Sequence, residues 1–171
     1  MLFSLDLMFK EINMYRIGFS EDIHPVKTGR KLVLGGIEIP SEFGLDGHSD
    51  ADVVLHSVAE AILGALAKGD LGDHFPDNDP KYKGITSSLL LKEVVDLMEK
   101  EGYKVNNIDI QIAAAQPKLS SFKLKMRENI ASLLKTDINN VSIKAMSFNK
   151  VGAIGEGKAI RSQCVCMLIK I

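Results

Sequence analysis

The stretch Asp50–Lys68 has the strongest periodicity in the sequence and does most to limit how the chain can fold. Apolar residues recur along it every four positions, at Val54, Val58, Ile62 and Leu66. This spacing is typical of the buried face of an amphipathic α-helix. Ser49 and Asp52 match the pattern of a capping box at its start, and Gly69 is a helix-ending residue. The sequence therefore predicts one long helix here, with Ser49 as its N-cap.

Segments rich in Ile, Val and Leu predict strands on both sides of this helix. The expected strands are Tyr15–His24, Lys31–Ile39, Val105–Ala115, Val141–Met146 and Ser162–Ile171, and two more helices are expected at Ser87–Glu101 and Phe122–Lys135. Gly69–Gly84 predicts a loop, and Gly152–Gly157 predicts a glycine-rich turn. Strands and helices do not alternate strictly. The predicted class is therefore α+β, with helices packed on one face of one sheet.

Composition excludes several classes of protein. With 171 residues, 46% of them apolar and 25% charged, the chain is expected to form one globular domain rather than a disordered or fibrous protein. A net charge of −1 with interspersed signs offers no basic stripe, so we expect no nucleic-acid partner. No apolar run approaches the roughly 20 residues that span a bilayer, so we expect no membrane partner. Cys164 and Cys166 are expected to be reduced core thiols of an intracellular protein.

The first thirteen residues are apolar but contain Asp6, Lys10 and Glu11. They lack the basic start and the small-residue cleavage site of a signal peptide. Two interpretations stay open: residues 1–13 form a short added helix, or Met14 is the natural start. We therefore treat 1–13 as an N-terminal extension and 14–171 as a single domain.

Asp22, His24 and His56 are the candidate metal ligands. Asp22 and His24 are two residues apart and leave the same face of a strand. His56 lies in the long helix, with His48 and Asp52 expected on the same side at four-residue steps. Two histidines and one aspartate would leave the fourth position of a tetrahedral zinc site open, as in catalytic sites. The alternative is that these are ordinary strand-end and helix histidines.

Other polar residues suggest weaker possibilities. His48 and Ser49 precede the long helix, and a helix N-terminus suits a phosphate. The loop acids are Asp70, Asp73, Asp77 and Asp79. These acids are either solvated turn formers or acceptors of hydrogen bonds from a polyol. The glycine-rich turn is weak evidence for phosphate binding.

Several motifs together carry a resemblance to a known family. They are Asp22-Ile-His24, Gly35-Gly36-Ile37-Glu38-Ile39-Pro40, His48-Ser-Asp-Ala-Asp-Val-Val-Leu-His56, Gly69-Asp-Leu-Gly-Asp-His-Phe-Pro-Asp77, Pro117-Lys118-Leu119 and Lys144-Ala145. From Tyr15 to its C-terminus the chain resembles the 2-C-methyl-D-erythritol 2,4-cyclodiphosphate synthases. The element that runs from His48 to His56 is the most specific of these motifs.

The resemblance implies a cytoplasmic enzyme of the non-mevalonate isoprenoid route, or a plastid-type location in a eukaryote. Its subunit would be a ferredoxin-like α+β fold, and a homotrimer would carry its sites at subunit interfaces. The 2-phosphate of 4-diphosphocytidyl-2-C-methyl-D-erythritol 2-phosphate would attack the β-phosphorus, giving the cyclic diphosphate and CMP. Positioning and charge neutralisation dominate such a reaction, and no nucleophilic side chain is needed.

The resemblance also implies roles for individual residues. Asp22, His24 and His56 would hold zinc, with Asp22 and His24 also near substrate, while His48 and Ser49 would bind phosphate. His48 and Ser147 would stabilise the transition state. The methylerythritol portion would contact Asp70, Leu71, Gly72, Phe75, Pro76, Asp77, Asn78 and Asp79. The cytidine diphosphate would contact Ala114, Ala115, Gln116, Pro117, Lys118, Leu119, Ser120, Met146, Ser147, Phe148 and Asn149, with the 114–120 segment from a neighbouring subunit.

The sequence departs from the family pattern between residues 146 and 156. Ser147 replaces a threonine, and Asn149 replaces a glutamate that ligates a second metal, usually magnesium. Because an amide brings no charge, we expect magnesium or manganese to bind with the substrate diphosphate more weakly than usual. Ala153 stands where a phenylalanine is usual, and Glu156 where an arginine contacts phosphate. Asn149 and Glu156 keep open one alternative, a non-catalytic trimeric module that binds zinc and diphosphate. A second alternative is a zinc phosphoesterase, in which the open zinc position carries an activated water.

Overall fold

The computed structural model describes residues 14–76, 82 and 84–171. Its strands are β1 (Tyr15–Thr28), β2 (Leu32–Leu34), β3 (Ile37–Ile39), β4 (Phe43–Leu45), β5 (Tyr103–Ala113), β6 (Val141–Met146) and β7 (Ala159–Lys170). Its helices are α2 (Val53–Leu66), α3 (Leu71–His74), α4 (Ser87–Lys100), α5 (Lys123–Leu133) and α6 (Gly152–Gly155), with short 3-10 turns at Ile138–Asn140 (η2) and Phe148–Lys150 (η3). The proposed extension at residues 1–13 lies outside the described residues.

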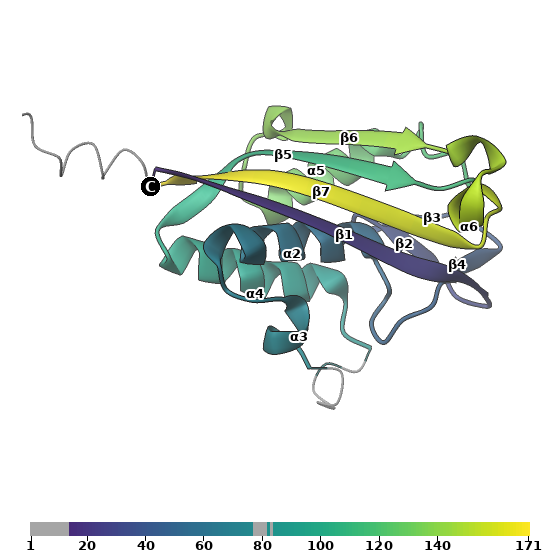
Figure 1. Cartoon of the computed structure of the whole chain (residues 1–171), viewed down its shortest axis with the longest axis horizontal. Helices are drawn as coiled ribbons and strands as arrows, with labels where there is room; N and C mark the ends of the chain where they lie inside the picture. The colour runs from purple at the N-terminus through teal and green to yellow at the C-terminus, as the bar shows by residue number, and fades with distance from the viewer. Residues whose placement is uncertain (1–13, 77–81, 83) are drawn as a thin grey trace, which may run out of the picture.

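The main sheet has five strands in the order β4-β1-β7-β5-β6, and α2, α4 and α5 lie on one of its faces (Figure 1). The α+β class with helices on one face is therefore confirmed. The ferredoxin-like detail is wrong, because that fold follows a β-α-β-β-α-β order. Here α5 connects the parallel strands β5 and β6, and β7 then returns antiparallel between β1 and β5.

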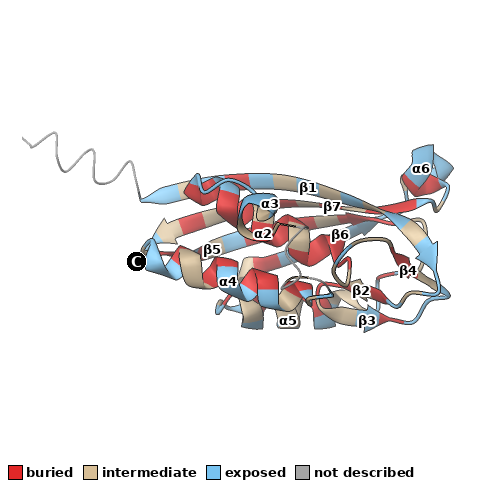
Figure 2. Ribbon diagram, turned by 90° about the horizontal axis from the view of Figure 1, so that it is seen from below, coloured by how far each residue is buried: buried red, intermediate tan, exposed pale blue. Residues whose placement is uncertain are grey.

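Helix α2 packs closely against the sheet, and Figure 2 shows buried residues where α2 meets the strands. Gly18 on β1 makes this approach possible. A Cβ atom at Gly18 would lie 1.8 Å from the carbonyl oxygen of Ala61, so any larger residue would push the helix away. The strand that carries Asp22 and the helix that carries His56 are therefore held at a short, fixed separation.

Several local predictions were wrong. Lys31–Ile39 is not one strand, because Gly35 and Gly36 adopt left-handed backbone angles and turn the chain into the β2–β3 hairpin. The loop predicted at Gly69–Gly84 contains the short helix α3, and the glycine-rich turn contains α6. A short strand, β4, was not predicted. It is only three residues long and pairs with the end of β1.

The long helix begins later than the sequence predicted. Its N-cap is Asp52, whose carboxylate accepts hydrogen bonds from the N–H groups of Val54 and Leu55. Asp52 is fully buried and also accepts from the N–H groups of Gly35 and Gly36. Burial raises the pKa of Asp52 to about 6. The predicted N-cap, Ser49, therefore lies in the preceding loop, and Asp52 faces the hairpin rather than the metal ligands.

On the sheet face opposite the helices, β1 and β7 expose apolar side chains. Ile17 and Phe19 on β1 are 67% and 61% exposed, and Val165, paired with Phe19 across the strands, is 45% exposed. Cys164 and Cys166 point to the other face, where both are buried and unbridged, as predicted. In the described part of the chain, no helix has the length and apolar character needed to cross a membrane.

Candidate metal centre and a second cavity

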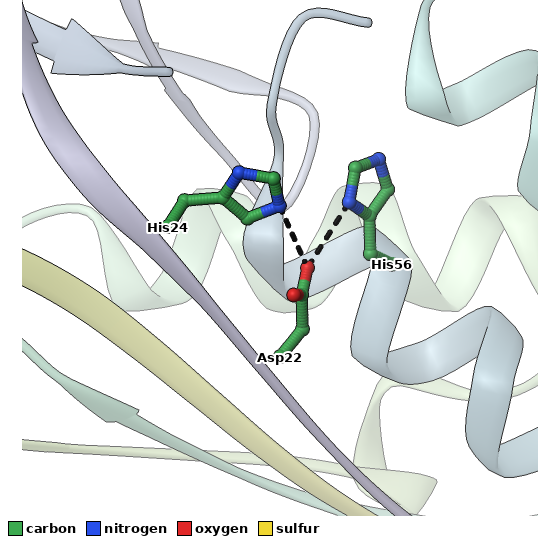
Figure 3. Close-up of side chains that lie close together, drawn as sticks. All are labelled: Asp22, His24 and His56. Atoms are coloured by element: carbon green, nitrogen blue, oxygen red, sulfur yellow. Dashed lines mark hydrogen bonds and ion pairs between the residues drawn. The ribbon is translucent and has the colours of Figure 1, made fainter. Parts of the chain in front are cut away.

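Asp22, His24 and His56 come together as the sequence predicted (Figure 3). Asp22 Oδ2 lies 3.1 Å from His24 Nε2 and 3.1 Å from His56 Nδ1. Alternation along β1 turns Asp22 and His24 toward α2, and His56 extends toward them from the end of the first turn of α2. Because all three ligand atoms lie within 4.8 Å of one another, one cation could contact them together.

Hydrogen bonding favours the tautomer that a metal needs. His24 Nδ1 donates to the backbone carbonyl of Asp46 at 2.5 Å, so Nε2 is the nitrogen that faces Asp22 and that would offer its lone pair to a cation once its proton is lost. Metal-binding histidines are commonly held by such a bond from the second ring nitrogen. This donor set of two imidazoles and a carboxylate fits a divalent cation such as zinc.

Without a metal, the same groups stabilise one another as an ion pair. A hydrogen bond to Asp22 raises the pKa of His24, although burial opposes the shift. Burial alone would raise the pKa of Asp22, but the hydrogen bonds and charges of His24 and His56 outweigh it. The pKa of Asp22 therefore lies well below its usual range. Asp22 is therefore the negatively charged group at the position where a cation would bind.

The loop before α2 carries the two predicted phosphate ligands. His48 and Ser49 both line a cavity of about 320 Å³ that also contains the metal candidates. Arg30 holds this loop, because its guanidinium donates to the carbonyls of Gly47 and Ser49 at 2.6 Å each. No sequence pattern indicated Arg30, since its partners lie 17 and 19 residues further along the chain.

The same cavity is lined by some of the residues that were predicted to contact the methylerythritol portion of the substrate. Leu71, Gly72 and Phe75 line it, whereas Asp70 caps α3 through a reciprocal pair of hydrogen bonds with Asp73. These two loop acids therefore form a capping box. Pro76 does not line the cavity, and Asp77, Asn78 and Asp79 lie outside the described residues.

Glu60 is a lining residue that the sequence prediction missed. It lies four residues after His56 on α2, so helical spacing could have indicated it. Its carboxylate accepts a hydrogen bond from the N–H of Leu71 at 3.0 Å. Burial raises the pKa of Glu60. Glu60 therefore connects the helix that holds His56 to the segment that carries Leu71 and Gly72.

A second cavity, of about 840 Å³, lies where β5, β6 and α5 meet. It collects most of the predicted cytidine diphosphate residues: Ala114, Ala115, Pro117, Lys118, Leu119, Ser120, Met146, Ser147, Phe148 and Asn149. Gln116 is not among its lining residues. Lys123, at the first turn of α5, lines the cavity as well and was missed, because nothing in its sequence context marks it.

The wall formed by η3 has an unusual backbone. Phe148, Asn149 and Lys150 all have positive φ angles, between 47° and 67°. The Phe148 ring lies under Arg161, with the guanidinium carbon 4.9 Å from the ring centroid. Glu156 forms an ion pair with Lys158 at 2.6 Å and does not line the cavity. Glu156, which stands where an arginine is usual in the family, is therefore not one of the groups that a ligand in this cavity would meet.

Comparison with known proteins agrees with this geometry. The YgbB family model matches residues 15–169. A curated 2-C-methyl-D-erythritol 2,4-cyclodiphosphate synthase from Brachyspira hyodysenteriae is 54% identical over 155 residues, covering 91% of this chain and 98% of the relative.

Two solved structures have the same fold. The bifunctional IspDF from Campylobacter jejuni is 38% identical with a TM-score of 0.88, covering 92% of this chain and 42% of that one. The IspF–CDP complex from Plasmodium falciparum is 35% identical with a TM-score of 0.82, covering 92% and 97%. The chain therefore belongs to the YgbB family, the 2-C-methyl-D-erythritol 2,4-cyclodiphosphate synthases of isoprenoid biosynthesis.

Proposed function

We propose that the chain converts 4-diphosphocytidyl-2-C-methyl-D-erythritol 2-phosphate into 2-C-methyl-D-erythritol 2,4-cyclodiphosphate and CMP. An oxygen of the 2-phosphate attacks the β-phosphorus. The bond from that phosphorus to the bridging oxygen breaks, and CMP leaves with this oxygen, as in a phosphorus–oxygen lyase. The observation that carries the proposal is the convergence of Asp22, His24 and His56 in a cavity, within a chain of this family.

Zinc, held by Asp22 Oδ2, His24 Nε2 and His56 Nδ1, would supply Lewis-acid chemistry at a phosphate oxygen. His48 and Ser49 line the same cavity and would donate hydrogen bonds to that phosphate. His48 would also stabilise charge on the phosphoryl group during transfer, because it is exposed at the cavity wall and free to approach substrate. Ser147 would do the same from the second cavity.

The two cavities divide the substrate between them. The methylerythritol portion would lie against Leu71, Gly72 and Phe75, beside the metal ligands. The cytidine diphosphate would bind in the larger cavity, where Lys118 offers a charge to the diphosphate and the 114–120 segment forms one wall. The CDP-bound relative from Plasmodium falciparum supports a ligand of this class.

The division of the site supports a homotrimer with shared active sites. The lining residues of the two cavities do not overlap, although the reaction needs the metal beside the diphosphate. A second copy could bring its larger cavity against the metal cavity of the first. The open apolar face of β1 and β7 supplies a surface for such association, because Ile17, Phe19 and Val165 are exposed there.

The second metal of the family is a poor fit to this chain. Among the described residues, the larger cavity is lined by Lys118 and Lys123 and by no carboxylate. Asn149 offers only an amide oxygen, and Glu156 is paired with Lys158 outside the cavity. Magnesium or manganese would therefore bind mainly through the substrate phosphates and more weakly than at a glutamate.

One incubation tests the proposed reaction against the two alternatives. Purified chain is mixed with the cytidine diphosphate substrate and zinc, and CMP and the cyclic diphosphate are quantified together. We expect equal amounts of both products. A non-catalytic binding module would give neither product. A zinc phosphoesterase would release a linear phosphate without the ring.

A further inference from the structure

The inner nitrogen of His56 faces Asp22, and its outer nitrogen is held by a second group of residues. His56 Nε2 lies 2.8 Å from Ser87 Oγ, and that oxygen lies 2.5 Å from Asp50 Oδ1. The backbone N–H of Ser87 also donates to Asp50 Oδ2 at 3.1 Å. Ser87 is 1% exposed, so these contacts are shielded from competing water. The three side chains form a continuous chain of hydrogen bonds that leads away from the candidate metal centre.

The proton positions in this chain follow from the chemistry of its members. A carboxylate is only an acceptor, so the Ser87 hydroxyl must donate its single proton to Asp50. The lone pairs of Ser87 Oγ are then available to accept from His56, which places the ring proton on Nε2. When a cation occupies the site, the proton that Nδ1 would otherwise donate to Asp22 is absent, and the Nδ1 lone pair faces the cation.

Ser49 also approaches His56 Nε2, at 3.2 Å, but cannot fix the tautomer alone. Its hydroxyl accepts from the N–H of Ala51, and no carboxylate contacts it among the described residues. Its own proton is therefore free to rotate, so Ser49 could act as either donor or acceptor toward His56. The hydrogen bond between Ser87 and His56 has only one possible direction, because the Ser87 hydroxyl donates its own proton to Asp50.

We propose that Asp50 and Ser87 are positioning residues that hold the His56 ring in its metal-binding tautomer and orientation. This inference rests on the proposed divalent-cation site. Ser87 would hold the ring of His56 as the Asp46 carbonyl holds the ring of His24. The supporting hydrogen bond is at Nε2 in His56 and at Nδ1 in His24. Groups that orient a metal-binding histidine typically change metal affinity by about 10- to 100-fold. Ser87 also begins α4, so this helix is tied to the centre through one hydroxyl.

Zinc affinity of the full chain, measured by competition with a chromophoric chelator, tests the inference. We expect Ser87→Ala to weaken zinc binding by about 10- to 100-fold. Ser88→Ala is the matched control, since Ser88 is the next residue of α4 and is not among the hydrogen-bond partners of His56 in the described part of the chain. It should stay within about twofold of wild type. Ser87→Thr, which keeps the hydroxyl, should restore most of the affinity.

A double variant separates positioning from a general loss of structure. If Asp50 acts through Ser87, Asp50→Ala alone should weaken zinc binding. In the double variant it should cause little further loss beyond that of Ser87→Ala, because both substitutions remove the same chain of hydrogen bonds to His56. Cytidine diphosphate binding in the absence of zinc should be unchanged in both, since neither residue lines the larger cavity. Additive effects, or Ser87→Ala within about twofold of wild type, would overturn the proposal.

His56→Ala distinguishes failure of this inference from failure of the proposed cation site. If His56→Ala loses zinc while Ser87→Ala retains it, Asp50 and Ser87 do not position His56, but the proposed cation site stands. If His56→Ala binds zinc as wild type does, zinc lies elsewhere and both proposals fall.

Discussion

The two cavities of this chain differ in how firmly their polar groups are held. Around the metal candidates, His24 bonds to the Asp46 carbonyl, His56 to Ser87, and both face Asp22. In the larger cavity, Lys118, Ser147 and Asn149 are exposed, and neither Lys118 nor Lys123 has an ion pair within the described residues. The small cavity is therefore preorganised for one cation, whereas the large one presents groups that a ligand must order.

The difference indicates which part of the site tolerates sequence change. A cation site needs three atoms within a few ångströms, and each ligand depends on a further partner for its orientation. A nucleotide cavity spreads its binding over many weaker contacts, so one substitution can be offset by another. Two departures from the family pattern, Ser147 and Asn149, line the larger cavity, consistent with this division.

Loss of a metal ligand should have the largest effect. We expect the wild-type chain to hold about one zinc ion. His56→Ala should lose the zinc, and its activity should fall by more than about 100-fold, because only two of the three protein ligands remain. Elemental analysis and CMP release measure both. His74→Ala is the control, since its ring bonds to the Lys68 carbonyl away from the cluster. Wild-type protein purified free of metal without chelators would contradict the centre.

Mixing two inactive variants tests whether the cavities act across subunits. His56→Ala removes the metal half of a site, and Lys118→Glu disables the nucleotide half. If sites are shared, trimers re-formed from equal amounts should regain about one quarter of wild-type activity, because one site in four pairs two intact halves. Light scattering checks that trimers re-form. No recovery in verified mixed trimers would mean that each chain holds a complete site.

Lys118→Ala should weaken nucleotide binding without affecting the metal. Removing one charge-assisted contact to a diphosphate typically costs about 1.5 to 3 kcal/mol, or roughly a 10- to 100-fold loss of affinity. Calorimetry with cytidine diphosphate measures it, and zinc content should stay constant. Lys125→Ala serves as control, because Lys125 is exposed on the nearby helix α5 but does not line the cavity. Equal losses in both variants would point to general attraction rather than a specific contact.

The pH should act in opposite directions on metal-free and metal-loaded protein. The pKa of His24 is raised above 6.5 by Asp22, so the ion pair stabilises metal-free protein below about pH 6.5 and is lost as pH rises through the raised value. Zinc binding strengthens over the same range, because fewer protons compete for Nε2. Calorimetric Tm values between about pH 6 and 8 should therefore show a widening gap. A constant gap would indicate that His24 does not bind the cation.

Restoring a carboxylate at residue 149 should have the smallest effect. Asn149→Glu should lower the magnesium concentration for half-maximal rate by a few-fold, because the new charge adds to the ligands that the substrate phosphates supply. Zinc content should not change. Glu156→Gln is the control, since Glu156 pairs with Lys158 outside the cavity. If all three proteins respond to magnesium identically, residue 149 does not contact the second metal.

The sequence alone determined the long helices, most of the long strands and the metal candidates. Four-residue apolar spacing predicted α2, and the two-residue spacing of Asp22 and His24 placed both on one strand face, because these periods follow from backbone geometry. The motifs from His48 to His56 then indicated the family, which the comparisons confirmed. These inferences succeeded because each depended on residues close together in the chain.

The tertiary structure decided everything that depends on distant segments meeting. Asp52, not Ser49, caps α2, because the β2–β3 hairpin supplies two more N–H groups to its buried carboxylate. Ser87 contacts His56 across 31 residues, a contact that no local pattern encodes. The sheet order, with β7 between β1 and β5, likewise follows from long-range pairing. Local spacing fixes which way a side chain points, but only packing fixes what it meets.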